Sequence, residues 1–222
     1  MARIRAAEAH ERPFTTDCRD CPRLAAFLDR CRTTHPGYHA RPVAPFGAAR
    51  PSLLVVGLAP GMHGANRSGR PFTGDYAGVV LYAALHRYGF ASRPESVRAD
   101  DGLRLVNCRI TNAVKCVPPG NKPTPAEIRQ CNGYLRAELT GLSRGAVILA
   151  LGRIAHEAVL RAFSLKLAGY AFAHGARHAL PAGPRLFDSY HCSRYNINTR
   201  RLTAAMFDQV MAAVQQATGE PA

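Results

Sequence analysis

The stretch Ser52–Asp75 reads SLLVVGLAPGMHGANRSGRPFTGD, and it decides the fold that we expect for the rest of the chain. Its apolar run Leu53–Val56 has the length and β-branched content of a strand covered on both faces. The glycines and prolines that follow are incompatible with regular structure, so we expect the strand to open into a glycine-rich loop. In α/β proteins, ligands bind at such loops, outside the carboxyl ends of the strands.

Strands and helices are predicted to alternate on both sides of this stretch. The helix that follows it, Tyr76–Tyr88, is rich in small and aliphatic residues and ends at Gly89. Strands separated by helices imply a parallel sheet with helices on both faces. The other strands are predicted at Leu105–Val114, Ala146–Leu151 and Arg185–Tyr190, and the other helices at Leu24–Arg32, from Pro125 onward, at Ile154–Phe163 and at Thr203–Ala217.

The size of the chain suits one domain. It has 222 residues, of which 47% are hydrophobic, and this is enough to bury one substantial core. No apolar run is long enough to span a membrane, and residues 1–12 lack the apolar segment of an export signal. We therefore expect a single domain over residues 1–222, in a cytoplasmic protein that does not enter a membrane.

Basic residues outnumber acidic ones, 29 against 15, and the formal net charge is +14. A basic protein gains affinity for nucleic acid by releasing counterions, whatever the base sequence. An arginine-favouring codon bias is the alternative explanation, because Lys115, Lys122 and Lys166 are the only lysines in the sequence. Such a bias does not explain the shortage of acidic residues, so nucleic acid is the favoured partner.

The seven cysteines favour a metal site or buried thiols over a disulfide framework, because their number is odd and no export signal is present. Cys18 and Cys21 form a Cys-x-x-Cys pair in a polar stretch that offers no apolar surface to fill. Cys116 and Cys131 form a second pair with fourteen residues between them, and the capping box Thr124–Glu127 places Cys131 on a helix. Alone, Cys131 would be an ordinary core thiol.

Taken together, these four cysteines can converge on one metal centre. Sites with four thiolates suit either zinc or an iron–sulfur cluster. Compact zinc modules pair two short Cys-x-x-Cys knuckles, whereas the second spacing here is long and crosses a helix N-terminus. We therefore prefer a [4Fe-4S] cluster, with Cys18, Cys21, Cys116 and Cys131 as its N-terminal and mid-chain ligands.

Polar side chains gather in three loops that follow predicted strands, at residues 59–75, 112–124 and 189–196. Asp, Asn and His side chains above one edge of a sheet can orient a water molecule, accept a proton and stabilise an anion. This combination predicts hydrolysis without a nucleophilic side chain. The spacing alone does not name the substrate.

Six segments carry a resemblance to a known family. They are Gly57–Gly61, His63–Gly64, Asn66–Arg67, Gly69–Asp75, Cys116–Pro123 and Ser189–His191. Together they resemble the family 5 (type B) uracil-DNA glycosylases over most of the chain. The resemblance includes the four cysteines, at the spacing with which this family and its family 4 relatives bind a [4Fe-4S] cluster. Family 4 members usually have an acidic residue where Leu58 stands, which favours family 5.

The resemblance implies a three-layer α/β/α sandwich around a central four-stranded parallel sheet. It also implies a monofunctional enzyme that acts on a nucleotide flipped out of DNA and leaves an abasic site. Its substrates would be uracil and other deaminated bases, such as hypoxanthine and xanthine. We expect it to act as a monomer.

The same resemblance assigns roles to individual residues. Asp75 would position or deprotonate the attacking water, Asn121 would help to hold that water, and His191 would donate to the base carbonyl and stabilise the leaving base. Phe72 would stack on the base. The structural alternatives are a helix N-cap for Asp75, a turn residue for Asn121, a loop histidine for His191 and a core aromatic for Phe72. The glycine loop would contribute Gly57, Gly61 and His63 to the base-binding set.

Asn112 and the segment after His191 have more open roles. Family 4 relatives use an asparagine at the position of Asn112 to read uracil, whereas family 5 members need not have one. Asn112 would therefore either pair with the uracil edge or cap its strand. The segment Ser193, Arg194, Tyr195 and Asn196 would form a minor-groove wedge, with Arg194 or Tyr195 filling the gap left by the flipped base. A plain surface loop is the alternative.

Three other functions stay open at this level. A family 4-like uracil-DNA glycosylase is the nearest, and a non-catalytic iron–sulfur DNA-binding module is the second. The third is an enzyme of another class that binds phosphate with the glycine loop. The lack of Gly-Lys-Ser/Thr after the loop and of a Gly-x-Gly-x-x-Gly motif counts against the third.

Three further histidines are predicted to have no chemical role. His174 and His178 lie in a loop rich in glycine and alanine, without a carboxylate or a third histidine beside them in the sequence. We therefore expect both to face solvent. His156, on the helix after Gly152, is expected to be structural.

Overall fold

The computed structural model describes residues 13–181 and 183–219; residues 1–12, where the sequence predicts no export signal, lie outside this range. Its centre is a six-stranded sheet in the order β1-β3-β2-β4-β6-β5. The four inner strands run parallel: β3 (Cys108–Asn112), β2 (Leu53–Gly57), β4 (Val147–Leu151) and β6 (Arg185–Ser189). The predicted α/β fold with a central four-stranded parallel sheet is therefore confirmed.

The two edge strands were not predicted. β1 (Phe46–Gly47) pairs antiparallel with β3, and β5 (Arg177–Ala179) pairs antiparallel with β6. Both are too short to show the alternation of apolar and polar residues by which a strand is recognised in a sequence. β5 nevertheless changes the surroundings of β6, because it closes the edge of the sheet beside the last predicted polar loop.

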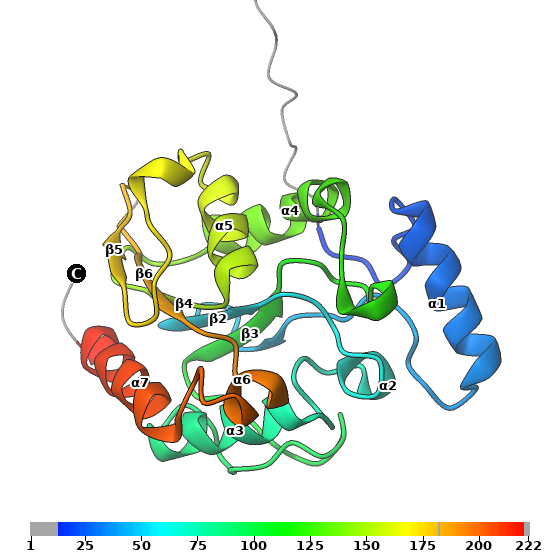
Figure 1. The fold of residues 1–222 in the computed structure, drawn as a ribbon, viewed down its shortest axis with the longest axis horizontal. Coiled ribbons are helices and arrows are strands. Elements are labelled where there is room, and N and C mark those ends of the chain that lie inside the picture. The colour runs from blue at the N-terminus through cyan, green and yellow to red at the C-terminus, as the bar shows by residue number, and fades with distance from the viewer. Residues whose placement is uncertain (1–12, 182, 220–222) are drawn as a thin grey trace, which may run out of the picture.

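Helices cover both faces of the sheet, as Figure 1 shows. The helices α4 (Pro125–Thr140) and α5 (Arg153–Ala162) pack with Leu54 and Val56 of β2, together with α1 (Pro22–Thr34). Leu53 and Val55 face the other side and pack with α3 (Tyr76–Arg87) and α7 (Ala204–Gly219). Because successive side chains of a strand point to opposite faces, one short apolar run supports both layers of helices.

The remaining elements are short. They are α2 (Ala65–Ser68), α6 (Arg194–Asn198) and the 3₁₀ turns η1 (Pro119–Asn121) and η2 (Leu167–Gly169). The strand predicted at Leu105–Val114 was too long: Leu105 makes an isolated bridge to Ala91, and the ladder begins at Cys108. Among the described residues, no helix combines the length and the apolar content needed to cross a membrane.

The register of the sheet brings the polar loops to one edge. Gly57, the last residue of β2, lies opposite Asn112, the last residue of β3. Leu151, the last residue of β4, lies opposite Ser189 of β6. The loops that follow β2, β3 and β6 therefore leave the sheet at the same level.

The start of α4 is fixed by a complete capping box. The Thr124 hydroxyl accepts the Glu127 amide at 3.2 Å, and the Glu127 carboxylate accepts the Thr124 amide at 2.7 Å. The same carboxylate accepts two hydrogen bonds from Arg23 on α1, at 2.7 and 2.8 Å. The cap therefore joins α4, which carries Cys131, to the helix that begins after Cys21.

Replacing Thr124 with alanine removes the acceptor for the Glu127 amide. We expect Thr124→Ala to lower the free energy of unfolding by about 1 kcal/mol. For a chain of this length that corresponds to a fall of about 2–4 °C in Tm. Thr124→Ser keeps the hydroxyl and is the matched control. Equal Tm values for Thr124→Ala and the parent protein, measured by circular dichroism, would contradict this account of the cap.

Candidate functional site

A cavity of about 420 Å³ lies above the carboxyl ends of β2, β3 and β6. Its wall is mostly apolar and comes largely from the glycine loop, with polar groups at a few positions. This is usual for pockets that bind small organic groups. Residues from all three polar loops meet there. The predicted site residues that line it are Gly61, His63, Phe72, Asp75, Asn112, Asn121, His191, Ser193 and Arg194.

Three predicted residues do not line the cavity. Gly57 is buried behind it, Tyr195 is 71% exposed on α6, and the Asn196 side chain donates to the His191 carbonyl at 2.8 Å. The segment expected as a loop is instead the start of α6, where the Ser193 hydroxyl accepts the Asn196 amide at 3.3 Å. This cap was not recognised in the sequence because α6 is a short helix of five residues.

Gly57 leaves room for two side chains that do line the cavity. A Cβ at this position would lie 2.4 Å from Asn112 Oδ1 and 2.7 Å from the Phe72 ring. Both distances are far shorter than van der Waals contact. A side chain at position 57 would therefore displace Phe72 or Asn112 from the cavity wall.

Asp75 uses its two carboxylate oxygens differently. Oδ1 accepts the Gly78 amide at 2.9 Å and so caps α3. Oδ2 faces the glycine loop, where a Cβ would lie 3.2 Å from it at Gly61 and 2.3 Å from it at Gly64. The N-cap that was the structural alternative is thus present, and the second oxygen still faces the cavity, where it can accept a hydrogen bond from water.

The rings of Phe72 and His191 lie next to each other in the wall. Their centroids are 5.9 Å apart and their planes differ by 27°. Phe72 is 6% exposed and has a φ of 53°, a left-handed conformation that is unusual for a bulky side chain. Strained backbone of this kind persists where the surroundings fix it, and it is concentrated at ligand-binding sites.

The electrostatic surroundings of His191 favour the neutral ring. Burial lowers the pKa of His191 below the ordinary histidine value of 6.5, and the carboxylate of Asp75 opposes this by raising it. Burial is the larger effect. A neutral imidazole still carries one N–H, so it can donate a hydrogen bond to a carbonyl without bringing a full charge into the cavity.

The two predicted asparagines differ in setting. Asn112 is 3% exposed, and among the described residues its Oδ1 has no hydrogen-bond partner. A buried polar atom without a partner is costly, so this oxygen is suited to accept from a ligand. Asn121 is exposed at the rim, with a φ of 58° that asparagine tolerates readily.

Two tyrosines support the cavity and were not predicted. The Tyr38 hydroxyl lies 2.9 Å from Nδ1 of His63, and the Arg194 guanidinium carbon lies 4.9 Å from the centre of the Tyr76 ring. Tyr38 comes from the connector before β1, which carries no motif. Tyr76 follows Asp75 directly, but its position in the sequence fits an ordinary helical residue equally well.

The four predicted cysteines meet on the other side of the molecule from α3, where all of them line a second cavity. Cys21 is the N-cap of α1, Cys131 lies on α4, and the Lys115 amide donates to Cys131 Sγ at 3.3 Å. Burial, and to a smaller extent Cys131, raises the pKa of Cys21 to about 11. Burial also raises the pKa of Cys116 and Cys131. A raised pKa favours the protonated thiol, whereas a bound cationic centre would hold a cysteine as the thiolate.

The four cysteine sulfurs do not form a compact group of ligand atoms. Within residues 13–181 and 183–219, the one group of three or more His, Cys, Asp or Glu ligand atoms within 4.8 Å of one another is His156, His178 and Asp188. No three of the four cysteine sulfurs therefore lie within 4.8 Å of one another, whereas the ligands of a tetrahedral zinc with Zn–S bonds of about 2.3 Å are roughly 3.8 Å apart.

No lysine among the described residues lines the cavity between β2, β3 and β6. Lys115 is buried on the cysteine side, where its ammonium lies 2.6 Å from Glu138 and also bonds Thr111. Lys122 is exposed. Within the part of the chain that the structure describes, the wall of this cavity therefore carries no lysine amine that could attack a ligand.

Comparisons with known proteins agree with the geometry. Residues 44–215 match the family profile described as "Uracil DNA glycosylase superfamily". The chain is 48% identical to a type-5 uracil-DNA glycosylase of Thermus thermophilus over 210 residues, which cover 92% of this chain and 95% of that protein. It is 41% identical to a type-5 enzyme of Pyrobaculum aerophilum, with 88% and 86% covered. A type-4 enzyme of Archaeoglobus fulgidus is 36% identical, over 54% of this chain and 53% of that protein.

The lowered pKa of His191 can be measured by NMR. We expect its ring to stay neutral as the pH falls through 6.5 and to titrate at a lower pH than an exposed histidine. Asp75→Asn removes the charge that favours the imidazolium, so in that variant the midpoint should fall further. Asp100→Asn, at an exposed carboxylate, is the control, and His191→Gln identifies the signal. A midpoint at or above 6.5, or one that rises in Asp75→Asn, would contradict the assignment.

Proposed function

The chain belongs to the uracil-DNA glycosylase superfamily, and from this we propose that it removes uracil from DNA by hydrolysing the N-glycosidic bond. The observation that carries the proposal is the single cavity that Asp75, Asn121 and His191 share. Relatives named type-5 uracil-DNA glycosylases match it over most of its length, whereas the type-4 relatives match about half. We therefore favour type-5 over type-4 activity.

The substrate would be a nucleotide that has left the base stack. An enzyme that acts on a base within a duplex must extrude it into a pocket, and unstacking costs a few kcal/mol. The net charge of +14 supports binding to the phosphate backbone. Exposed Tyr195 and Arg194, at the start of α6 beside the cavity, are the candidates for the side chain that fills the gap in the stack.

Within the cavity, Phe72 would stack on the extruded base. Breaking the glycosidic bond leaves positive charge on the sugar and negative charge on the base. A neutral His191 would donate its N–H to a base carbonyl and stabilise the negative charge as it develops. No nucleophilic side chain is needed in this scheme, because water attacks the sugar and completes the reaction.

Asp75 and Asn121 would handle that water. The Asp75 Oδ2 atom faces the cavity beside Gly61 and Gly64, so it can accept a proton from the attacking water or hold it in position. Asn121, at the rim, would supply a second hydrogen bond. Because Oδ1 is held by the Gly78 amide, the carboxylate has one fixed orientation.

We propose that the enzyme is monofunctional and leaves an abasic site. A glycosylase that also cleaves the strand forms a covalent intermediate through an amine. The cavity wall has no lysine among the described residues, and Lys115 is committed to Glu138. Water is therefore the acceptor of the sugar.

The substrate range would extend to other deaminated bases. Uracil, hypoxanthine and xanthine each present an N–H next to a carbonyl on the edge that pairs with another base. The Oδ1 atom of Asn112, which lacks a partner, can accept that N–H, and His191 can donate to a carbonyl. Adenine and cytosine instead have an acceptor ring nitrogen where these bases have the N–H, so that nitrogen would face the Asn112 oxygen with a second acceptor.

We further propose that Cys18, Cys21, Cys116 and Cys131 hold a [4Fe-4S] cluster. The four cysteines line one cavity, and the Lys115 amide that donates to Cys131 would suit a ligand sulfur of such a cluster. Its place beside α1 and α4, apart from the base cavity, suits a structural role. A monomeric state and a cytoplasmic location stay predictions from the sequence.

Base release can be assayed with a labelled duplex that contains uracil, followed by alkali to cleave abasic sites. We expect cleavage by the parent protein, and a loss of about 100-fold or more in single-turnover rate for Asp75→Asn. Asp100→Asn should retain the parent rate. Tight binding of the duplex without any base release would instead identify the non-catalytic DNA-binding module.

Metal analysis tests the cluster separately. We expect about four iron atoms and four inorganic sulfides per chain, with a brown colour. Cys131→Ala should lose them, whereas Cys108→Ala, at a buried cysteine outside the group, should keep them. A colourless protein with one zinc per chain at these cysteines would overturn the proposal.

A further inference from the structure

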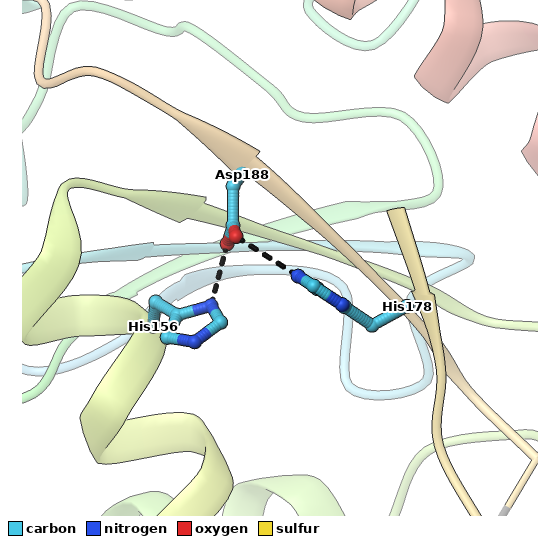
Figure 2. Close-up of side chains that lie close together, drawn as sticks. All are labelled: His156, His178 and Asp188. Atoms are coloured by element: carbon cyan, nitrogen blue, oxygen red, sulfur yellow. Dashed lines mark hydrogen bonds and ion pairs between the residues drawn. The ribbon is translucent and has the colours of Figure 1, made fainter. Parts of the chain in front are cut away.

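A second group of metal-ligand side chains lies apart from both sites. His156 on α5, His178 on β5 and Asp188 on β6 point toward one another (Figure 2). Nδ1 of His156 lies 2.8 Å from Asp188 Oδ1, and Nε2 of His178 lies 3.1 Å from Asp188 Oδ2. The side chains are 2%, 14% and 0% exposed, in the same order. The expectation that His178 faces solvent is therefore wrong, because it packs on Asp188.

A count of hydrogen-bond donors and acceptors leaves this group one donor short. Nε2 of His156 lies 3.0 Å from the Tyr170 carbonyl, which can only accept, so this nitrogen must donate. Its Nδ1 then also faces an acceptor, Asp188 Oδ1. A neutral imidazole supplies one donor and not two. The contact between His156 and Asp188 therefore requires an additional cation, either a proton or a metal ion.

The surroundings match those of a metal ligand. A histidine that binds a metal through one ring nitrogen usually donates its other N–H to a backbone carbonyl or carboxylate, as His156 does to Tyr170. The aromatic rings of Tyr170 and Phe172 pack edge-on against His178 and His156, with centroids 5.8 and 5.6 Å apart. They form an apolar shell of the kind that limits the access of water to a bound ion.

We propose that His156, His178 and Asp188 bind one divalent transition-metal ion, and that zinc is the ion that fits them best. The three ligand atoms lie within 4.8 Å of one another. Two imidazoles favour zinc or a neighbouring transition metal over magnesium or calcium, which prefer oxygen ligands. The ion supplies the missing positive charge, and it takes the place of the proton between His156 and Asp188.

A metal ion at this site would stabilise the fold and would not contact the base. None of its three ligands lines the base cavity, but Asp188 lies on β6, and His191 follows the end of that strand, three residues after Asp188. A bound ion would tie the short edge strand β5 and the helix α5 to β6. It would thereby stiffen the strand from which His191 leaves the sheet.

The test uses the whole protein with its cysteine site filled, so that zinc cannot bind there. After removal of loose metal with a chelator, the protein is incubated with zinc chloride, desalted and analysed for zinc. We expect one zinc per chain in the parent protein. His178→Gln should bind zinc at least about 100-fold more weakly, because the loss of an outer-shell partner alone can weaken metal binding by up to about 100-fold. Zinc should also raise the Tm of the parent and leave that of the variant unchanged.

The variant separates a metal site from a network of hydrogen bonds. The glutamine amide can donate to Asp188 as the His178 N–H does, so a network without metal survives the change, whereas the imidazole ligand is lost. His174→Gln, at a neighbouring histidine outside the group, should keep full zinc binding. Equal zinc content and equal Tm in the parent and in His178→Gln would overturn the proposal.

X-ray absorption of the zinc-loaded parent gives a second reading that does not depend on any variant. Nitrogen and oxygen neighbours, with the scattering pattern of two imidazoles, support the site. Sulfur neighbours would place the zinc at the cysteines and overturn it.

Discussion

The lack of a side chain at Gly57 is the constraint on which the base cavity depends. The ends of β2 and β3 are level, so Asn112 points across the space above Gly57, and the Phe72 ring occupies the same space from the loop. A glycine at the last position of the strand lets both side chains reach the cavity wall. Phe72 takes this place with a left-handed backbone, at a φ of 53°.

The glycine loop has a second requirement of the same kind around Asp75. Gly61 and Gly64 approach one carboxylate oxygen, while the start of α3 holds the other. Because Asp75 caps α3 and also lines the cavity, the stability of this helix is linked to the position of the carboxylate that we propose handles water. The part of the wall that carries His191 is built differently. The His191 ring packs beside Phe72, and its backbone carbonyl accepts a hydrogen bond from Asn196.

Much of this arrangement could be predicted from the sequence because its signals are local. The apolar run at Leu53–Val56, the capping box at Thr124 and the Cys-x-x-Cys pair each lie within a few residues. The carboxyl ends of parallel strands meet at one edge, so the three polar loops could be brought together without coordinates. The role of each residue came from a family resemblance, and the chemistry of the individual side chains stays a prediction.

What the sequence could not provide depends on contacts between distant segments. The sequence predicts a loop at His178, because β5 has only three residues. Asp188 lies in a strand that is predicted from its apolar neighbours, so nothing in the sequence singles it out. Their pairing with His156 requires α5, β5 and β6 to be placed in three dimensions. Tyr38, which contacts His63 from the connector before β1, was missed for the same reason.

The order of the cavity residues along the chain also bears on synthesis. The four cysteines of the proposed cluster site, Asp75 and Asn121 precede β4, whereas His191 follows β6, the last strand among the described residues. A nascent chain that has emerged only as far as α5 contains most of the cavity wall but lacks His191, Ser193 and Arg194, which complete it. The cavity is therefore complete only once β6 has joined β4 and the segment after it is in place.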